Sequence, residues 1–272
     1  TMSFNANTNN ETSYAIFEWS ADEVKNHSIT VVADPDNETV ELNESNNILS
    51  QPIYVNAPDL TVTNLAIVGH AFDPKHPEHT DPACNYPNKV IATIKNEGNV
   101  SVENVSVEFY AGKDISINRF FGGWKNESND TITQLGANKI RVHFNSISVG
   151  SNSYVSIFDK DNNTVDTIAE GKSDYWSKWA EGDTIRIYAY SGGITSYSII
   201  FGIDKYEYVF ANETISVAAN TCESASGIWM AAPATITNET ESLTVMLDDY
   251  VITVIADPDN EVKELNETNN KI

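Results

Sequence analysis

The sequence predicts an all-β protein built of β-sandwiches. Two observations carry this prediction: short runs of alternating apolar and polar residues recur along the chain, and Asn, Asp, Gly and Pro separate them. A third observation, an acidic and Asn-rich phrase that occurs twice, indicates that one structural unit is repeated.

The alternating runs have the length and period of half-buried β-strands, whereas helix signals are nearly absent. Their spacing, with turn residues between successive runs, is typical of sandwiches. Strands are therefore expected at residues 27–33, 89–96, 105–112, 139–146, 154–159, 183–191, 197–203 and 250–256.

Charge and composition exclude several classes of partner. The 272 residues contain 16 Lys and Arg against 39 Asp and Glu, which gives a net charge of −23. Such a surface repels nucleic acid and anionic lipid headgroups. The chain is 40% hydrophobic and 10% aromatic, which favours packed cores over disorder. Because no run of about 18 apolar residues occurs, we expect no direct membrane insertion by this segment.

Twelve Asn-x-Ser/Thr sequons, about twice the number expected by chance, indicate an extracellular location. The alternative explanation is that Asn, Ser and Thr are all common in turns. Thr1 opens the chain without a signal-peptide pattern, so we expect a mature form or a fragment. The candidate glycosylation sites are Asn10, Asn26, Asn37, Asn43, Asn99, Asn104, Asn126, Asn129, Asn162, Asn212, Asn238 and Asn266.

The repeated phrase reads ADPDNETVELNESNN at residues 33–47 and ADPDNEVKELNETNN at residues 256–270. The offset between the copies is 223 residues. Upstream, MSFNANT (2–8) resembles ISVAANT (215–221) at an offset of 213, so the later copy carries ten extra residues. Residues 1–55 are therefore expected to be the C-terminal half of a unit of which a second copy follows.

The second unit opens with DLTVTNLAIV, continues with VIATIKNEGNVSVENVSVEFY, and closes with ITVIADPDNEVKELNETNN. These stretches resemble CARDB domains, the cell-adhesion-related, immunoglobulin-like modules of archaeal and bacterial cell-surface proteins. The resemblance implies immunoglobulin-like β-sandwiches and a cell-surface location, with an archaeal source favoured. It makes 1–55 the second half of one sandwich, and 56–113 with 209–272 the two halves of the next.

The block between these halves, 114–208, resembles a CUB-like domain through IRVHF, YVSIFD, a pattern of two tryptophans before GDTIRI, and the closing FGIDKYEY. The resemblance implies a jelly-roll β-sandwich inserted at a hairpin and protruding from the CARDB body. Calcium ligands of CUB domains would fall near Val149, Ser153 and Ser191. None of the three is acidic, so we expect that calcium site to be lost.

Two other stretches offer metal ligands. The loop 69–84 collects His70, His76 and His79 close to Cys84, which are ligand types for Zn²⁺, although their spacing matches no structural zinc pattern. The alternative is a solvated loop stiffened by Pro74, Pro77 and Pro82, and this alternative is favoured. In the turn 159–164, Asp159, Asp161 and Thr164 could attract a cation, but a polar hairpin turn is the favoured explanation.

The repeated phrase itself is the third candidate. A cluster of carboxylates in a loop suits Ca²⁺, which is the candidate cofactor, and Asp257 and Asp259 are the proposed ligands. The alternative, which we favour, is a structural hairpin, because Asp-Pro-Asp-Asn is turn chemistry and the paired Asn residues can bind the backbone. The acidic residues are Asp34, Asp36, Glu38, Glu41 and Glu44 in the first copy, and Asp257, Asp259, Glu261, Glu264 and Glu267 in the second.

Cysteine and tryptophan residues give two further hypotheses. Cys84 and Cys222 flank strands of the same expected sandwich, so a disulfide between them is the favoured interpretation, with two free thiols as the alternative. Trp176 and Trp179 could stack on sugar rings if they lie at the surface, although core packing is the default for aromatic residues.

Motifs for catalysis are missing from the sequence: it contains no G-x-S-x-G, H-E-x-x-H, P-loop or dinucleotide fingerprint. We therefore expect a non-enzymatic extracellular structural or adhesion module of an envelope layer, fibre or filament, with assembly by strand exchange between subunits. Its expected partners are neighbouring repeats or subunits of a surface array, with glycans or cell-surface proteins as further candidates. The alternative function is carbohydrate or protein binding by the CUB-like insertion, including as an accessory part of a secreted hydrolase.

Overall fold

The computed structural model describes residues 16–19, 26–41, 43–69, 82–83, 85–121, 126–192, 199–238, 242–244 and 250–272. The chain divides into two compact units, which we call unit 1 (Thr1–Ala57) and unit 2 (Pro58–Ile272). Its described part is nearly all β, which confirms the predicted fold class. One 3₁₀ turn, Glu44–Asn46, is the helical element of these ranges.

No helix within the described ranges is long and apolar enough to cross a membrane.

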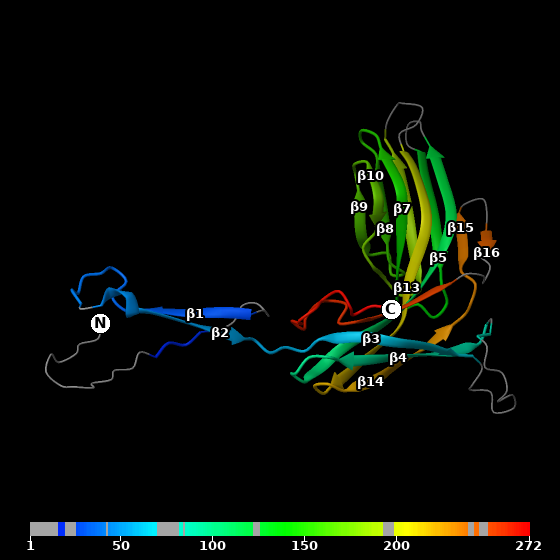
Figure 1. Ribbon diagram of the computed structural model, residues 1–272. Coiled ribbons are helices and arrows are strands. Elements are labelled where there is room, and N and C mark those ends of the chain that lie inside the picture. The colour runs from blue at the N-terminus through cyan, green and yellow to red at the C-terminus, as the bar shows by residue number, and fades with distance from the viewer. Residues whose placement is uncertain are drawn as a thin grey trace. The chain divides into compact units, whose positions relative to one another are not determined.

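The described residues of unit 1 form an antiparallel hairpin (Figure 1). Strand β1 (Asn26–Val32) pairs with β2 (Ile48–Tyr54) in a continuous register from Asn26 opposite Tyr54 to Val32 opposite Ile48. The loop between the strands is the first copy of the acidic phrase, and the 3₁₀ turn lies within it.

Unit 2 begins with an immunoglobulin-like sandwich. Its first sheet has the order β14-β4-β3, made of β3 (Leu60–Val68), β4 (Pro87–Asn96) and β14 (Cys222–Met230). Strand β4 alternates half-buried and buried residues along its whole length, as expected when one face packs on a core. The facing sheet consists of β17 (Val251–Ala256) and parts of two long strands, β5 (Val102–Phe121) and β13 (Ile199–Val217).

The same two long strands continue into a second sandwich, in which they join β7 and β10 in the order β10-β7-β13-β5-β17, with β11 also paired to β7 (Figure 1). The opposite sheet has the order β16-β15-β6-β12-β8-β9. The bounds are β6 Asn126–Thr133, β7 Lys139–Val149, β8 Tyr154–Phe158, β9 Thr164–Ile168, β10 Lys172–Trp176, β11 Ala180–Glu181, β12 Thr184–Ser191, β15 Thr235–Asn238 and β16 Ser242–Thr244.

The long strands differ from the expected organisation, in which the boundaries of the insertion fall at 113/114 and 208/209. Both positions lie inside β5 and β13, which pair from Phe121 opposite Ile199 to Val102 opposite Val217. The register shifts between Ile203 and Lys205 and again between Val209 and Ala211. Such bulges bend and twist a strand, which lets one strand pair change its packing partner without a linker. The CUB-like identity of the insertion remains a prediction.

Strand β15 shows a second departure from the expected organisation, in which residues 209–272 belong to the CARDB-like sandwich. Strand β15 pairs with β6, from Thr235 opposite Thr133 to Asn238 opposite Asp130. A segment assigned to the CARDB half of the chain therefore extends a sheet of the inserted sandwich.

One hydrophobic core runs through unit 2, because β5 and β13 contribute to both sandwiches. In the immunoglobulin-like part the fully buried side chains include Leu60, Ile94, Val107 and Phe109. In the inserted part they include Ile132, Phe144, Ile157, Ile185 and Phe201, the last at 1% exposure. Continuous packing of this kind explains why Pro58–Ile272 forms one compact unit.

Candidate functional site

The closing loop of unit 2 (Ala256–Asn270) begins with a turn made by its Asp-Pro-Asp-Asn residues. Oδ1 of Asp257 accepts a hydrogen bond from the backbone N–H of Glu261 at 3.0 Å, and Oδ2 accepts one from Val262 at 2.9 Å. Asp257 and Asn260 have φ of 50° and 55°, in the left-handed region that Asp and Asn tolerate better than most residues. The turn residues are thus explained by backbone conformation and backbone hydrogen bonds.

The closing loop of unit 1 (Ala33–Asn47) repeats this turn. The Asp34 carboxylate accepts hydrogen bonds from the backbone N–H groups of Glu38 at 3.0 Å and Thr39 at 2.8 Å. Asp34 and Asn37 have φ of 46° and 52°. Each value falls within a few degrees of its counterpart 223 residues later, so the two copies share a conformation as well as a sequence.

The second half of the loop is also the same in both copies. Oδ1 of Asn43 accepts from the backbone N–H of Ser45 at 3.1 Å, and Oδ1 of Asn266 accepts from Thr268 at 3.1 Å. Beyond the loop, Val32 pairs with Ile48 in unit 1, while Ile255 pairs with Lys271 in unit 2. These pairs are equivalent at the offset of 223, so both loops close the same hairpin register.

In unit 2 this loop is attached to the first strand of the sandwich through a buried carboxylate. One oxygen of Glu264 accepts a hydrogen bond from the backbone N–H of Leu60, and the other accepts one from Nδ2 of Asn270 at 2.9 Å. The exposed fractions are 5% for Glu264, 6% for Asn270 and 0% for Leu60. The carboxylate therefore satisfies a buried backbone donor that has no strand partner on this side.

Backbone contacts extend the attachment on both sides of Glu264. The N–H of Leu265 donates to the carbonyl of Pro58 at 3.0 Å, and the N–H of Val62 donates to the carbonyl of Asn269 at 3.3 Å. Nδ2 of Asn269 also donates to the side chains of Asp59 at 3.0 Å and Thr61 at 2.7 Å. The loop and residues 58–62 thus form one hydrogen-bonded surface.

The environment of Glu264 raises its pKa to about 7. Burial is the largest cause, and the neighbouring carboxylates of Glu267 and Asp257 add to it. The hydrogen bonds from Leu60 and Asn270 act in the opposite direction because they stabilise the carboxylate. A group that titrates near neutral pH therefore lies at the junction between the loop and the opening strand.

A comparison with protein families identifies the family to which the two closing loops belong. The model of the CARDB family matches residues 6–51 and 203–272. Both segments belong to the CARDB family. The matched segments contain both closing loops and both strands that lead into them, β1 and β17.

Two other comparisons add no identity. No curated protein matches the chain. Among solved structures, a chain from the structure of the infectious bursal disease virus Gt strain aligns at 7% identity with a TM-score of 0.19, covering 82% of this chain and 68% of that one. A likeness at that level carries no argument about fold or function.

The acidic residues of the second CARDB loop form a compact group. Asp257, Glu264 and Glu267 each offer a carboxylate oxygen within 4.8 Å of the others, whereas Asp259 is not part of the group. Both oxygens of Asp257 and both oxygens of Glu264 already accept hydrogen bonds from the chain. The arrangement fits the structural interpretation of the loop, and calcium binding by Asp257 and Asp259 remains a prediction.

Other metal predictions have different outcomes. The histidines expected to bind zinc, His70, His76 and His79, lie outside the described residues.

Asp159 accepts hydrogen bonds from the backbone N–H groups of Asp161 at 2.9 Å and Asn163 at 2.8 Å. The Asn163 side chain is the largest cause of a lowered pKa of Asp159. This carboxylate holds a polar turn between β8 and β9, as the favoured explanation has it.

The two cysteines of the expected disulfide are Cys84, just before β4, and Cys222, at the start of β14. Cys222 is a free, exposed thiol opposite Lys95, while Cys84 lies outside the described residues. The residue after Cys84, Asn85, donates its N–H to Ala231 at 2.9 Å, beyond the other end of β14. The disulfide between Cys84 and Cys222 remains a prediction.

Sequence reasoning did not find the aromatic and charged network on the outer face of β7. The Arg141 guanidinium lies over the rings of Trp176 and Trp179, at 4.5 Å and 4.3 Å from their centroids. Its Nε donates to Glu207 at 2.9 Å. Two residues further along β7, the imidazole of His143 lies between the carboxylates of Asp204, 2.6 Å from Nδ1, and Asp174, 3.0 Å from Nε2. The indole faces that Arg141 covers are thus occupied by the protein itself.

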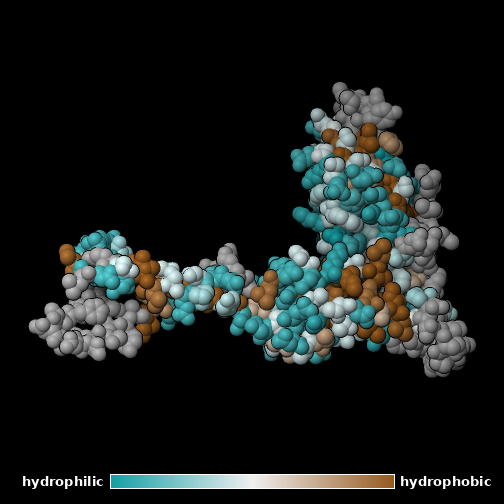
Figure 2. Space-filling view, in the orientation of Figure 1, coloured by the Kyte–Doolittle hydropathy of each residue, from teal (hydrophilic) through white to brown (hydrophobic). Residues whose placement is uncertain are grey.

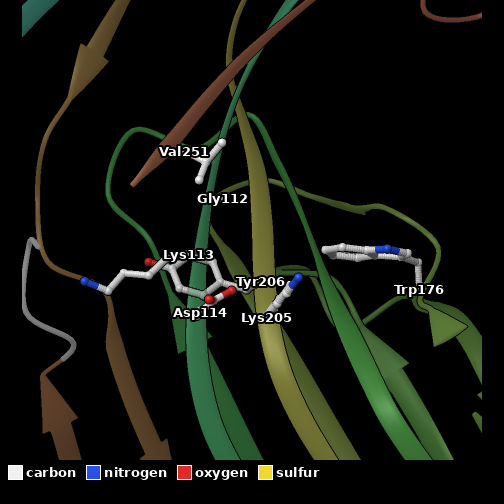
Figure 3. A pocket seen from close by; sticks show the side chains of 7 residues that line it. All are labelled: Gly112, Lys113, Asp114, Trp176, Lys205, Tyr206 and Val251. Atoms are coloured by element: carbon white, nitrogen blue, oxygen red, sulfur yellow. The ribbon is translucent and has the colours of Figure 1, made fainter. Parts of the chain in front are cut away.

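Trp176 also borders a shallow cavity of about 210 Å³ (Figure 3). The other residues that line it come from β5, β13 and β17, and Figure 3 shows them spread across neighbouring strands. They are Gly112, Lys113, Asp114, Lys205, Tyr206 and Val251. Lysine and aspartate beside an indole ring are groups that can bind a polar ring such as a sugar.

Most sequon asparagines in the described ranges are accessible. Asn37, Asn104 and Asn162 occupy turns with positive φ, as the turn explanation expects. Glycosylation itself remains a prediction. The exposed sequon residues are Asn26, Asn37, Asn43, Asn99, Asn104, Asn126, Asn162, Asn212 and Asn266; Asn129 and Asn238 are half-buried, and Asn10 lies outside the described residues.

Proposed function

We propose that this chain is a non-enzymatic structural and adhesion module in which CARDB units follow one another to form part of a cell-surface layer, fibre or filament. CARDB is a family of cell-adhesion-related, non-catalytic immunoglobulin-like domains that are generally extracellular. The observation that carries the proposal is the repetition of one closing loop in unit 1 and unit 2, with the same hydrogen bonds to its first Asp and to its Asn-x-Ser/Thr asparagine.

Chain connectivity supports a serial arrangement. Strand β2 ends at Tyr54 and the opening strand of the next unit starts at Leu60, so only five residues connect them. A repeated unit joined by so short a connection suits a serial array of such units. A net charge of −23 would keep such an array hydrated and would attract cations to it.

The test is accessibility on intact cells of the source organism. Antibodies raised against the full chain should label unpermeabilised cells, and mild protease treatment of those cells should remove the label. Labelling that requires permeabilisation would overturn the proposed location. Negative-stain electron microscopy of the extracted protein should show layers or filaments, and isolated monomers alone would contradict the array.

The second candidate function, carbohydrate binding by the inserted sandwich, is favoured by the cavity beside Trp176. A glycan array probed with the full chain tests it. Binding that is lost in Trp176→Ala, but kept in Trp229→Phe, which changes a buried tryptophan that does not line this cavity, would support the carbohydrate function. Absence of binding to all glycans would leave the structural role as the better account.

A further inference from the structure

We propose that the closing loop of unit 2 (Ala256–Asn270) binds one Ca²⁺ ion through three carboxylates and one carboxamide oxygen. The carboxylates are those of Asp257, Glu264 and Glu267, and the carboxamide is that of Asn270. The ion lies where the loop meets the opening strand of the sandwich. This inference goes beyond the proposed structural role and does not rest on it, because it concerns unit 2 alone.

The three carboxylates have a spacing that suits a cation. Each offers an oxygen within 4.8 Å of the others. The centre of three atoms spaced in this way is at most about 2.8 Å from each of them, close to the Ca–O bond length of about 2.3–2.6 Å. Asp257 and Glu264 are 7% and 5% exposed, so water screens the repulsion between their charges poorly. A bound cation offsets this repulsion.

A buried oxygen without a hydrogen-bond donor gives independent evidence for a ligand. Asn270 is 6% exposed, and its Oδ1 has no partner among the described residues. Its Nδ2 donates to Oε1 of Glu264 at 2.9 Å, and its backbone carbonyl accepts from Ala256, the residue before Asp257. The two polar atoms of a carboxamide are about 2.2 Å apart, so Oδ1 lies within about 5 Å of that Glu264 oxygen. The carboxamide therefore points into the carboxylate group.

Asn269 offers the same observation one residue earlier. Its Oδ1 is also buried without a partner in the described part of the chain, while its Nδ2 donates to Asp59 and Thr61. Within the described ranges, these two Oδ1 atoms are the buried side-chain polar atoms that lack a partner. Unpaired buried acceptors are rare and costly, and a bound ion beside them is one of the few groups that can account for them. Both atoms lie in the loop that carries the carboxylate group.

Hydrogen bonds from the chain leave room for an ion. Asp257 and Glu264 accept hydrogen bonds with both of their oxygens, but each carboxylate oxygen has about two lone-pair positions. Oε1 of Glu267 accepts from the backbone N–H of Glu264 at 2.9 Å, which holds this exposed side chain beside the other two carboxylates. Hydrogen bonds of this kind orient the ligands of a metal site.

The ligand atoms select Ca²⁺ among the common cations. All are oxygens, whereas Zn²⁺ favours nitrogen and sulfur. Side chains on one irregular loop suit the variable geometry of Ca²⁺ better than the strict octahedron of Mg²⁺. Hydrophilic residues cover much of the visible face of unit 2 (Figure 2), so water can complete the coordination shell. Through Glu264 the ion also fixes the acceptor of the Leu60 N–H, which strengthens the attachment of the opening strand.

The test is a titration of the full chain, labelled with ¹⁵N and freed of metal by a chelator, with CaCl₂ at pH 8. We expect saturable chemical-shift changes at residues 257–270, including the side-chain amide of Asn270, with a Kd of about 0.1–1 mM. The Tm should rise by about 3–10 °C at about 10 mM Ca²⁺.

Two variants that lose the same charge from the same loop form the matched pair. In Glu267→Gln the Ca²⁺ affinity should fall about tenfold or more, because a charged ligand is lost. Glu267 is exposed, and glutamine keeps the oxygen that accepts the Glu264 N–H, so the fold does not depend on this change. In the control Asp259→Asn, which changes an exposed carboxylate outside the group, the affinity should stay within about twofold.

Three results would overturn the inference. One is the absence of shifts at residues 257–270 at about 10 mM Ca²⁺. Another is an equal loss of affinity in Glu267→Gln and Asp259→Asn. The third is an equal rise in Tm with Mg²⁺, since screening of the net charge of −23 would then account for the stabilisation. Each result is independent of surface labelling of cells, which tests the proposed function.

Discussion

The carboxylate of Glu264 accepts the backbone N–H of Leu60, two residues that lie 204 positions apart in the chain. Both are almost fully buried, and Asn270 satisfies the second carboxylate oxygen. The contact connects the first strand of unit 2 to its closing loop, around the whole inserted sandwich. The Glu264 carboxylate thus takes the place of the backbone carbonyl that a neighbouring strand would offer to the Leu60 N–H.

Glu264→Ala is expected to destabilise unit 2 by about 2–4 kcal/mol, because it leaves the Leu60 N–H and the Asn270 amide buried without an acceptor. Denaturant unfolding of the full chain measures the loss. Glu261→Ala is the matched control, since the exposed Glu261 contributes its backbone N–H to the turn. Equal midpoints for the two variants would show that the carboxylate is dispensable.

The pKa of Glu264, raised to about 7, gives unit 2 a pH dependence with a defined sign. The folded protein holds this proton more tightly than the unfolded chain, whose carboxyl group titrates near 4.5. The stabilising contribution is therefore complete below pH 4.5 and is lost as the pH rises through 7. The free energy of unfolding of Glu264→Gln, subtracted from that of the parent, should show this fall; a difference that is constant between pH 4.5 and 8 would contradict it.

Local chemistry in this chain could be predicted from the sequence, and long-range pairing could not. The Asp257 turn follows from Asp-Pro-Asp-Asn, and the strand positions follow from alternation, because both depend on neighbouring residues. Glu264 and Leu60 lie 204 positions apart, and no local sequence pattern around either residue indicates that it contacts the other.

The continuity of β5 and β13 across the expected domain boundaries could not be predicted for a related reason. The expected strands end at residues 112 and 203, whereas β5 and β13 continue through both positions, so the sequence pattern does not show that these strands run on from one sandwich into the other. The pairing of β15 with β6 and the separation of Cys222 from Asn85 along β4 are also matters of register. The pairing register depends on which face of each strand is buried in the folded sheet, and the sequence of one strand does not identify its partner strand.

Tyr208→Phe tests a buried hydrogen bond that connects the two sheets of the immunoglobulin-like sandwich. Nε1 of Trp229 on β14 donates to the Tyr208 hydroxyl at 2.8 Å, and the exposed fractions are 6% and 1%. Removing the hydroxyl leaves the indole N–H unpaired in the core, at a cost of about 1–3 kcal/mol. In a Trp229→Phe background the same change should cost much less, and a double-mutant cycle by denaturant unfolding measures the difference. Additive losses would mean that the hydrogen bond contributes nothing.

Gly227→Ala and Gly112→Ala form a matched pair that tests how closely the sheets approach. At Gly227 a Cβ would lie 2.5 Å from Cβ of Ala211 and 3.3 Å from Cγ of Phe109, so β14 has to move away from β13 and β5. Overpacking of this kind costs about 1–3 kcal/mol. At Gly112 the nearest atoms would lie at 3.8 Å and 4.0 Å, which is ordinary contact, and alanine there should leave stability unchanged or raise it by about 0.4–1 kcal/mol. Thermal unfolding of both variants checks the pair: if Gly227→Ala is as stable as Gly112→Ala, the close approach of the two sheets at β14 is wrong.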